Sequence, residues 1–183
     1  AIERQPWEIL VNSDGNRFVQ EDHESVDHIE HQIGKQSAHR HWTIMDQKML
    51  NEMPPMIYDW SNQRIAKEAN NHVMFKSGSS IRELAIKTGL HPVNLENAVN
   101  DLNSKLKNNQ VDSFGRLHRP LPIEEGPFYS VRMSGWSLCS FAGLGVNENF
   151  EVIRSSGEPI KNLYAIGEVI GFGATSGNAY VNG

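Results

Sequence analysis

The first apolar run in the chain predicts a strand and a hairpin. Residues 7–11 are rich in Trp, Ile, Leu and Val, which favour β-strands. Asp14 and Gly15 follow and precede the apolar pair in residues 17–19. Gly accepts the positive φ that a tight turn needs, so Asp-Gly between two apolar runs predicts a hairpin.

A helical period follows the hairpin. Val26, Ile29 and Ile33 lie at i, i+3 and i+7, which predicts a helix over residues 22–33 with Glu, Asp and His on its solvent side. The next elements are shorter and less regular. The pattern predicts strands at 42–45 and 73–76, a short helix at 61–71, and a break at 49–56, where Met-Pro-Pro-Met occurs.

The middle of the chain predicts two helices in succession. Ser80 and Glu83 have the spacing of a capping box, in which the two residues satisfy free backbone N–H groups. Gly89 is placed to end this helix in the left-handed conformation, and Pro92 suits the first turn of the next helix. One apolar stripe, which predicts core packing, runs along this second helix at Leu95, Val99, Leu102 and Leu106.

A long polar connection, residues 108–127, separates a part with predicted helices from a part with short predicted strands. It carries three prolines and is the expected crossing between subdomains. After it, the pattern predicts short strands at 128–133, 143–147, 151–154 and 163–166, with a Ser156-Gly157 turn. The fold class is therefore α+β, with one domain over residues 1–110 and a second, β-rich part over residues 111–183.

Composition narrows the function classes. The 183 residues hold 17 Lys+Arg and 22 Asp+Glu, and the net charge of −5 argues against a nucleic-acid partner. No apolar run approaches the ~20 residues that a membrane-spanning helix needs. The single Cys139 excludes an internal disulfide, which fits a reducing compartment and favours the cytoplasm. The chain opens at Ala1 and closes just after a glycine-rich run, so we expect a piece of a longer protein.

That glycine-rich run is the most informative segment. The predicted strand at 163–166 leads into Glu168, and a turn that exposes backbone N–H groups can approach an anionic or polar ligand. A carboxylate at a strand end can accept hydrogen bonds from sugar hydroxyls. A plain tight turn is the alternative explanation for the glycines. The residues of the run are Gly171, Gly173, Ala174, Thr175, Ser176, Gly177, Asn178 and Ala179.

Several histidines raise the question of a metal. Glu24, His28 and His31 lie at i, i+4 and i+7, and His39 and His41 follow. Such spacing can hold a metal, whereas the alternative is a solvated polar face followed by a loop, and we expect no metal site.

Three further side chains are candidates for chemistry. Cys139 has no base nearby in the sequence, which favours an inert buried thiol. Tyr129 and Tyr180 could each donate a proton, or could be packing aromatics.

Three stretches together resemble one flavoprotein family. It includes the flavin subunits of fumarate reductase and succinate dehydrogenase and the 3-ketosteroid dehydrogenases. Residues 9–21 are similar to its "ILVN..G.RFV.E" hairpin, and residues 114–116 with 126–131 to its return from the cap to the flavin domain. Residues 163–169 followed by 177–179 are similar to its "LYA.GE" strand and "GNA" helix start.

The resemblance implies an FAD-dependent oxidoreductase. Such enzymes transfer a hydride between flavin N5 and a substrate carbon, while a side chain handles a proton at the neighbouring carbon. Residues 1–110 would be the substrate-covering cap and residues 111–183 an incomplete part of the FAD-binding domain. Glu168 would bind ribityl or ribose hydroxyls, and Asn178 and Ala179 would lie near the isoalloxazine ring. The implied cofactor contacts are Glu168, Gly173, Ala174, Gly177, Asn178 and Ala179.

Departures from the family pattern concern the substrate. The arginine acid of the fumarate reductases corresponds to Ser25, their histidine pair to residues 136–139, and their substrate-binding arginine to the turn at 173–178. Two carboxylates without paired donors would leave buried charge, so fumarate and succinate are not the expected substrates. The remaining pocket residues resemble those of the ketosteroid dehydrogenases in being apolar. This resemblance implies an apolar small-molecule substrate, with Tyr129 as the candidate catalytic proton donor. The apolar pocket residues are Trp136, Leu138, Phe141, Phe172 and Tyr129.

The resemblance also implies that one wall of the flavin cleft lies elsewhere. A G-x-G-x-x-G segment does not occur in the sequence. Nanomolar binding needs ~12 kcal/mol, and half of the contacts would leave ~6 kcal/mol, a dissociation constant of tens of micromolar. We therefore expect the chain alone to be inactive, to hold FAD weakly, and to self-associate through Val169, Ile170 and Phe172. The alternatives are a noncatalytic interaction domain and a His-rich metal-binding module.

Overall fold

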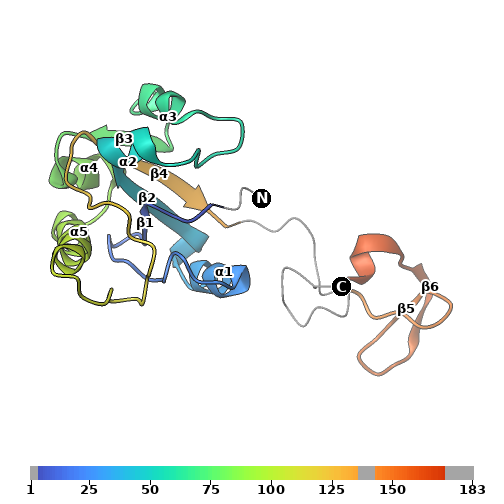
Figure 1. The fold of residues 1–183 in the computed structure, drawn as a ribbon. Coiled ribbons are helices and arrows are strands. Elements are labelled where there is room, and N and C mark those ends of the chain that lie inside the picture. The colour runs from blue at the N-terminus through green and yellow to red at the C-terminus, as the bar shows by residue number, and fades with distance from the viewer. Residues whose placement is uncertain (1–3, 136–142, 172–183) are drawn as a thin grey trace. The chain divides into compact units, whose positions relative to one another are not determined.

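The computed structural model describes residues 4–135 and 143–171, which belong to two units, residues 1–135 and 136–183. Figure 1 shows helices gathered around a small sheet in the first unit and a β-hairpin in the second. The mixture of helices and small sheets confirms the α+β class.

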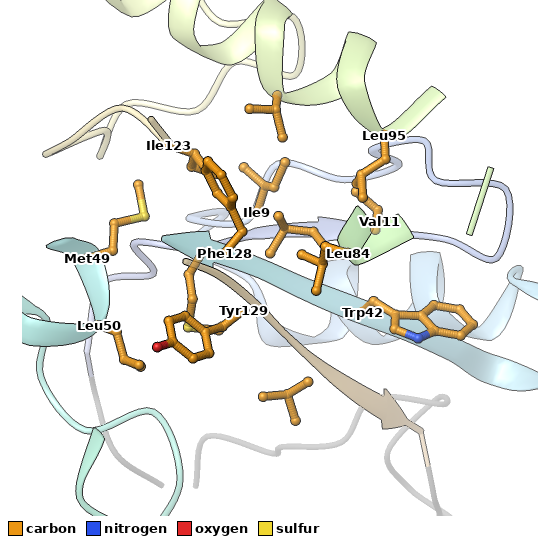
Figure 2. Packing of buried hydrophobic residues seen from close by; sticks show 14 of the residues in the cluster. Ile9, Val11, Trp42, Met49, Leu50, Leu84, Leu95, Ile123, Phe128 and Tyr129 are labelled. Carbon is orange, nitrogen blue, oxygen red and sulfur yellow. The ribbon is translucent and has the colours of Figure 1, made fainter. Parts of the chain in front are cut away.

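The first unit is built on a four-stranded antiparallel sheet with the order β1-β2-β4-β3. Its central strands pair over seven residues, from Arg40 opposite Ser134 to Asp46 opposite Phe128. Figure 2 places buried side chains above and below these strands, because neighbouring residues such as Phe128 and Tyr129 point to opposite faces. The strands are β1 (Ile9–Val11), β2 (Arg40–Asp46), β3 (Phe75–Gly78) and β4 (Phe128–Ser134).

Five helices and one 3-10 turn complete the first unit. They are α1 (Val26–Gly34), η1 (Ser37–His39), α2 (Gln47–Glu52), α3 (Asn62–Glu68), α4 (Ile81–Thr88) and α5 (Pro92–Lys107). Buried apolar residues of α2, α3, α4 and α5 join those of the sheet in one cluster, to which α5 contributes Leu95, Val99 and Leu102. The helix α1 has no buried residue. In the described part of the chain, no helix is long and apolar enough to cross a bilayer.

The local signals for α4 and α5 are confirmed. The hydroxyl of Ser80 accepts a hydrogen bond from Glu83 N at 3.1 Å, and Gly89 ends α4 at φ 78°. The carboxylate of Glu83 accepts from Ser79 N at 2.7 Å rather than from Ser80, so the box is shifted by one residue. Pro92 opens α5, as expected.

The Asp14-Gly15 turn is also present and is fixed by α5. Gly15 has φ 80°, and a Cβ at this position would lie 3.0 Å from His91 O and 3.1 Å from Leu95 N. The side-chain amide of Asn94 donates to Asp14 O at 2.9 Å. Only glycine fits here, because both the backbone conformation and the close approach exclude a side chain.

Two sequence expectations differ from the structure of the first unit. Residues 49–56 were expected to break the chain, but α2 covers Gln47–Glu52 because Asp46 caps it, and the break begins only at Met53, before the two prolines. Residues 108–127 were expected to cross between subdomains. They stay within the first unit, and the strand after them, β4, pairs between β2 and β3. The first unit therefore ends at Gly135, whereas the sequence placed a boundary near residue 110.

The described part of the second unit, residues 143–171, contains a β-hairpin followed by a 3-10 turn. β5 (Glu151–Ile153) pairs antiparallel with β6 (Pro159–Tyr164), and η2 covers Gly167–Ile170. The expected strand at 143–147 is only an isolated bridge between Val146 and Val152. Val152 and Ala165 are buried, but most of β6 is exposed. A two-stranded hairpin with so little burial is marginally stable by itself.

Candidate functional site

The predicted site residues fall into three groups. Tyr129 lies on β4 in the first unit, and Glu168 lies on η2 in the second. Gly173, Ala174, Gly177, Asn178 and Ala179 lie outside the described residues, as do 136–139. Each of the two described candidates, Tyr129 and Glu168, is therefore considered only with its neighbours in its own unit.

Tyr129 is buried and held by an amide. Its side chain packs in the core of the first unit, and its hydroxyl donates to Oε1 of Gln47 at 2.6 Å. Gln47 in turn donates from Nε2 to Oδ1 of Asn51 at 2.8 Å. Burial raises the pKa of Tyr129, so the phenol stays protonated at neutral pH. A protonated, fixed phenol is chemically able to donate a proton.

Glu168 occupies an open turn after β6. The residue is exposed, and the glycines on either side, Gly167 and Gly171, have φ 74° and 72°. A Cβ built on Gly167 would meet no atom within 4 Å, so the backbone at this glycine borders open space. The expected wall of a flavin cleft requires an exposed carboxylate here, and Glu168 is exposed. A carboxylate can accept hydrogen bonds from the hydroxyl groups of a ligand.

A buried ion network is the most strongly built polar feature of the first unit. The Arg17 guanidinium contacts the Glu21 carboxylate at 3.0 and 2.6 Å and the Asp112 carboxylate at 2.7 and 3.1 Å. The three side chains are 2%, 1% and 0% exposed. Burial alone would lower the pKa of Arg17, but the hydrogen bonds and charges of Glu21 and Asp112 outweigh it and raise that pKa. The pairing is bidentate on both sides, which is the strongest geometry for an arginine.

Asp112 is fixed from several directions. Burial works to raise the pKa of Asp112, but the bonds from Arg17 and from the backbone N–H groups of Phe114 and Arg116 lower it. Phe114 also covers the Arg17 guanidinium, whose Cζ lies 4.8 Å from the centre of the ring. Asp112 therefore stays ionised well below neutral pH.

Arg116 extends this network toward the start of the chain. Its three nitrogens donate to the carbonyls of His118 at 2.7 Å, Glu8 at 2.8 Å and Pro6 at 2.5 Å. Its Nη1 also lies 3.6 Å from Glu21 Oε2. Burial lowers the pKa of Arg116. Every nitrogen of this guanidinium has an acceptor within the chain.

The network joins two of the three stretches that carry the family resemblance. Arg17 and Glu21 belong to the hairpin motif, Arg116 belongs to the stretch 114–116, and Asp112 lies two residues before that stretch. Sequence reasoning named both stretches but missed their contact. The available signal was the presence of charged residues of both signs in the two stretches, because charges that become buried must be paired.

Ser25, which the motif resemblance sets at the position of the family's arginine acid, has a structural role. It is the N-cap of α1, and its hydroxyl accepts from His28 N at 3.3 Å. Nearby Asp22 accepts from the backbone N–H groups of Leu117 and His118 at 2.8 and 2.7 Å. In the turn after the hairpin, the hydrogen bonds to backbone N–H groups are therefore accepted by a neutral hydroxyl, that of Ser25, and by a carboxylate, that of Asp22.

The histidines do not form a metal site in the described residues. His23 and His28 stack with their ring centres 4.1 Å apart. Across residues 4–135 and 143–171, no three His, Cys, Asp or Glu side chains gather in a way that could hold a metal ion. The metal-binding alternative thus has no support in this part of the chain.

His41 makes stability dependent on pH. It is buried on β2, and its Nδ1 has no hydrogen-bond partner among the residues that the structure describes. Burial lowers the pKa of His41, so below about pH 6.5 the unfolded chain takes up a proton that the folded chain resists. The free energy of unfolding should fall from pH 7.5 to 5.5, with a limiting slope of about 1.4 kcal/mol per pH unit for this one group.

The His41→Leu variant should lose this part of the pH dependence in urea unfolding, with exposed His31→Leu as the control. An unchanged slope in His41→Leu would contradict the assignment.

Comparison with known proteins identifies the class. The FAD binding domain family matches residues 4–180, and the chain belongs to this family of FAD-dependent oxidoreductases. The chain is 27% identical over 163 residues to a probable fumarate reductase, Ifc3, of Shewanella frigidimarina. The aligned region covers 89% of this chain and 26% of that protein. The chain is also 28% identical over 186 residues to a vinyl phenol reductase of Lactiplantibacillus plantarum, covering 91% and 37%.

A solved structure shows the same fold. The 3-ketosteroid delta1-dehydrogenase of Sterolibacterium denitrificans aligns with a TM-score of 0.66 at 20% identity, over 91% of this chain and 33% of that one. The resemblance inferred from the motifs is therefore confirmed, and FAD is the cofactor of the family. The chain spans between a quarter and two fifths of the length of these relatives.

Proposed function

We propose that the whole protein reduces or desaturates a carbon–carbon bond next to an activating group, and that its substrate is neither fumarate nor succinate. The family match supports the reaction class. The observation that carries the choice of substrate is Ser25, which caps α1 where the dicarboxylate reductases have an arginine acid. In this proposal, the first unit (residues 1–135) is the substrate-covering cap, and the second unit (residues 136–183) is an incomplete part of the FAD-binding domain.

The arginines near this turn are committed to other groups. Arg17 is bound on both sides by Glu21 and Asp112, and Arg116 donates to three backbone carbonyls. Binding a substrate carboxylate would require either arginine to give up contacts that neutralise buried charge. Because leaving such a charge unpaired costs several kcal/mol, these side chains are poor ligands for a dicarboxylate.

The roles of the two described candidates follow from their surroundings. Bound FAD would supply hydride transfer. Tyr129 would hold a proton on its hydroxyl, fixed by Gln47, for transfer at the neighbouring substrate carbon. Glu168 would accept hydrogen bonds from cofactor hydroxyls on its exposed turn. By itself, the 183-residue chain would be inactive and would hold FAD only weakly, because most of each relative lies outside the aligned region.

A substrate panel tests the proposal. The full-length protein, reduced anaerobically, should be reoxidised by an apolar enone such as a 3-ketosteroid and not by fumarate, as followed by flavin absorbance. We expect a ratio of kcat/KM of at least about 10³, which is the range that an unpaired buried polar group can produce. Rapid reoxidation by fumarate would contradict the choice of substrate. Bound flavin that no activated alkene reoxidises would favour the noncatalytic alternative.

The Tyr129→Phe variant tests the proton donor. In the full-length protein, kcat with the best panel substrate should fall by about 10²–10⁴-fold, and the alkaline limb of the pH–rate profile should change. Tyr58→Phe is the matched control, because Tyr58 is 76% exposed. Normal turnover by Tyr129→Phe would show that the hydroxyl serves packing alone.

A further inference from the structure

We propose that Gln47 is a positioning residue whose amide serves both protonation states of Tyr129. Before proton transfer, the carbonyl oxygen of Gln47 accepts a hydrogen bond from the phenol. After transfer, the amide rotates and its NH₂ group donates to the phenolate oxygen. The inference rests on the proposed role of Tyr129 as proton donor and assigns a second residue to the same step.

The fold holds Gln47 and Tyr129 against each other. Gln47 is the first residue of α2, and its backbone N–H donates to Glu125 O at 3.0 Å. Tyr129 lies on the central strand β4, and Figure 2 shows its hydroxyl directed toward the side of α2. This hydroxyl donates to Gln47 Oε1 at 2.6 Å. Both backbones belong to fixed elements, so the contact does not depend on a loop.

The resting hydrogen bond occupies the proton that the reaction needs. A phenol carries one O–H and can donate one hydrogen bond, which Gln47 accepts. In the proposed step, the O–H bond of Tyr129 breaks as a C–H bond forms on the substrate, and a hydride enters the neighbouring carbon. A negative charge then stays on the phenol oxygen. The Gln47 carbonyl oxygen would repel this charge, whereas an N–H group would stabilise it.

The amide of Gln47 can present either group. A half-turn about its last side-chain bond exchanges the carbonyl oxygen and the NH₂ group. Nε2 of Gln47 donates to Oδ1 of Asn51 at 2.8 Å. Asn51 is exposed and can turn its own NH₂ group toward the rotated Gln47 oxygen, so both hydrogen bonds are kept. A groove of about 300 Å³ borders both side chains and gives the amides room to turn.

Charged side chains around Tyr129 are engaged elsewhere. Burial is the cause that raises the pKa of Tyr129. Asp46 caps α2, and Lys48 pairs with Glu125 at 3.6 Å. Arg64 lies over an indole ring, 3.9 Å from its centre. Among the described residues, the hydroxyl has no hydrogen bond from the other ionisable residues of α2, α3 and the strands β2, β3 and β4, which are Arg40, His41, Glu52, Lys67, Glu68, Lys76 and Arg132.

The direct test follows the side-chain NH₂ signals of Gln47 by ¹⁵N–¹H NMR while Tyr129 is titrated. Incorporated 3,5-difluorotyrosine has a more acidic phenol, which loses its proton at a pH where the chain is folded. The ¹⁹F signal missing in Tyr129→Phe reports the midpoint, and the NH₂ signals missing in Gln47→Met belong to Gln47. At this midpoint, one Gln47 N–H proton should move downfield, as a charge-assisted hydrogen bond requires.

Two controls and one contrary result complete this test. The downfield shift should vanish in Tyr129→Phe and persist in Tyr58→Phe, because Tyr58 is 76% exposed. Gln47 signals that do not respond when Tyr129 loses its proton would overturn the proposal.

Kinetics of the full-length protein separate a rotating amide from a simple anchor. Gln47→Glu keeps the acceptor and the shape but offers no N–H to the phenolate, so kcat should fall at least about tenfold with KM little changed. Gln47→Met lacks both groups and adds no negative charge, so it should retain more activity than Gln47→Glu. A simple anchor predicts the opposite order, because Glu can still hold the phenol, and that order would overturn the proposal. Gln63→Glu, at an exposed position of α3, is the matched control for added charge and should keep kcat unchanged.

The two measurements also distinguish this inference from the proposed function. A response of the Gln47 NH₂ signals with normal turnover of both Gln47 variants would uphold the two-state amide and refute Tyr129 as the proton donor. Loss of turnover in Tyr129→Phe without a response of the NH₂ signals would uphold the donor and overturn the role of Gln47.

Discussion

Replacing Arg17 with methionine should lower the free energy of unfolding by about 3–5 kcal/mol, as expected when one partner of a buried ion pair is removed. The variant keeps an unbranched side chain of similar length but leaves the buried Asp112 carboxylate without a cation and the buried Glu21 carboxylate with only Arg116, 3.6 Å away. Arg116 compensates only in part, because its nitrogens donate to backbone carbonyls. Urea unfolding of the chain, followed by circular dichroism, measures the loss.

Arg82→Met is the matched control for this experiment. Arg82 pairs with Glu96 at 2.6 Å, but its side chain is 56% exposed, so solvent screens the pair. Exposed ion pairs contribute about 0–1 kcal/mol, and this variant should lose no more than that. Equal losses in Arg17→Met and Arg82→Met would show that the buried network contributes nothing beyond an ordinary surface pair.

Asp46→Ala should cost about 2–4 kcal/mol, the sum of a lost helix cap and two lost bonds from backbone N–H groups to a carboxylate. Oδ1 of Asp46 accepts from Met49 N at 2.8 Å and caps α2. Oδ2 accepts from the backbone N–H groups of Glu124 and Glu125 at 2.8 and 2.9 Å. One carboxylate thus connects the end of β2, the start of α2 and the segment before β4. The same urea experiment applies.

Ser61→Ala separates the two contributions. Ser61 caps α3 through a single bond from Arg64 N at 3.2 Å and holds no second segment. This variant should lose about 0.5–1 kcal/mol, which is typical of an exposed cap. If Asp46→Ala lost no more than Ser61→Ala, the bonds to Glu124 and Glu125 would have no stabilising role.

Local signals were sufficient for the elements that depend on neighbouring residues. The caps at Ser80 and Gly89 and the start of α5 at Pro92 were predictable, because each involves residues within one turn of the helix. The α2 helix was missed because the prolines at 54 and 55 indicated a break over residues 49–56. Its cap, Asp46, also accepts hydrogen bonds from the backbone N–H groups of residues 124 and 125, which the local sequence does not indicate.

Contacts between distant segments could not be predicted from the pattern. Arg17 and Asp112 are separated by 95 residues, and periodicity reports burial along one element without naming the partner. For the same reason, β4 was assigned to a second part of the chain, although it completes the first sheet. At the candidate site, residue types indicated Tyr129 and Glu168, but the amide that holds Tyr129 became apparent only in the folded chain.

The position of β4 has a consequence for synthesis of the protein. It is the last strand of its sheet in sequence, yet it lies between β2 and β3. While a ribosome has released only the residues before Phe128, β2 and β3 cannot be joined, and each keeps an unsatisfied edge. The sheet therefore cannot be completed until Ser134 has left the exit tunnel, and the unpaired edges of β2 and β3 are exposed to other chains during that interval.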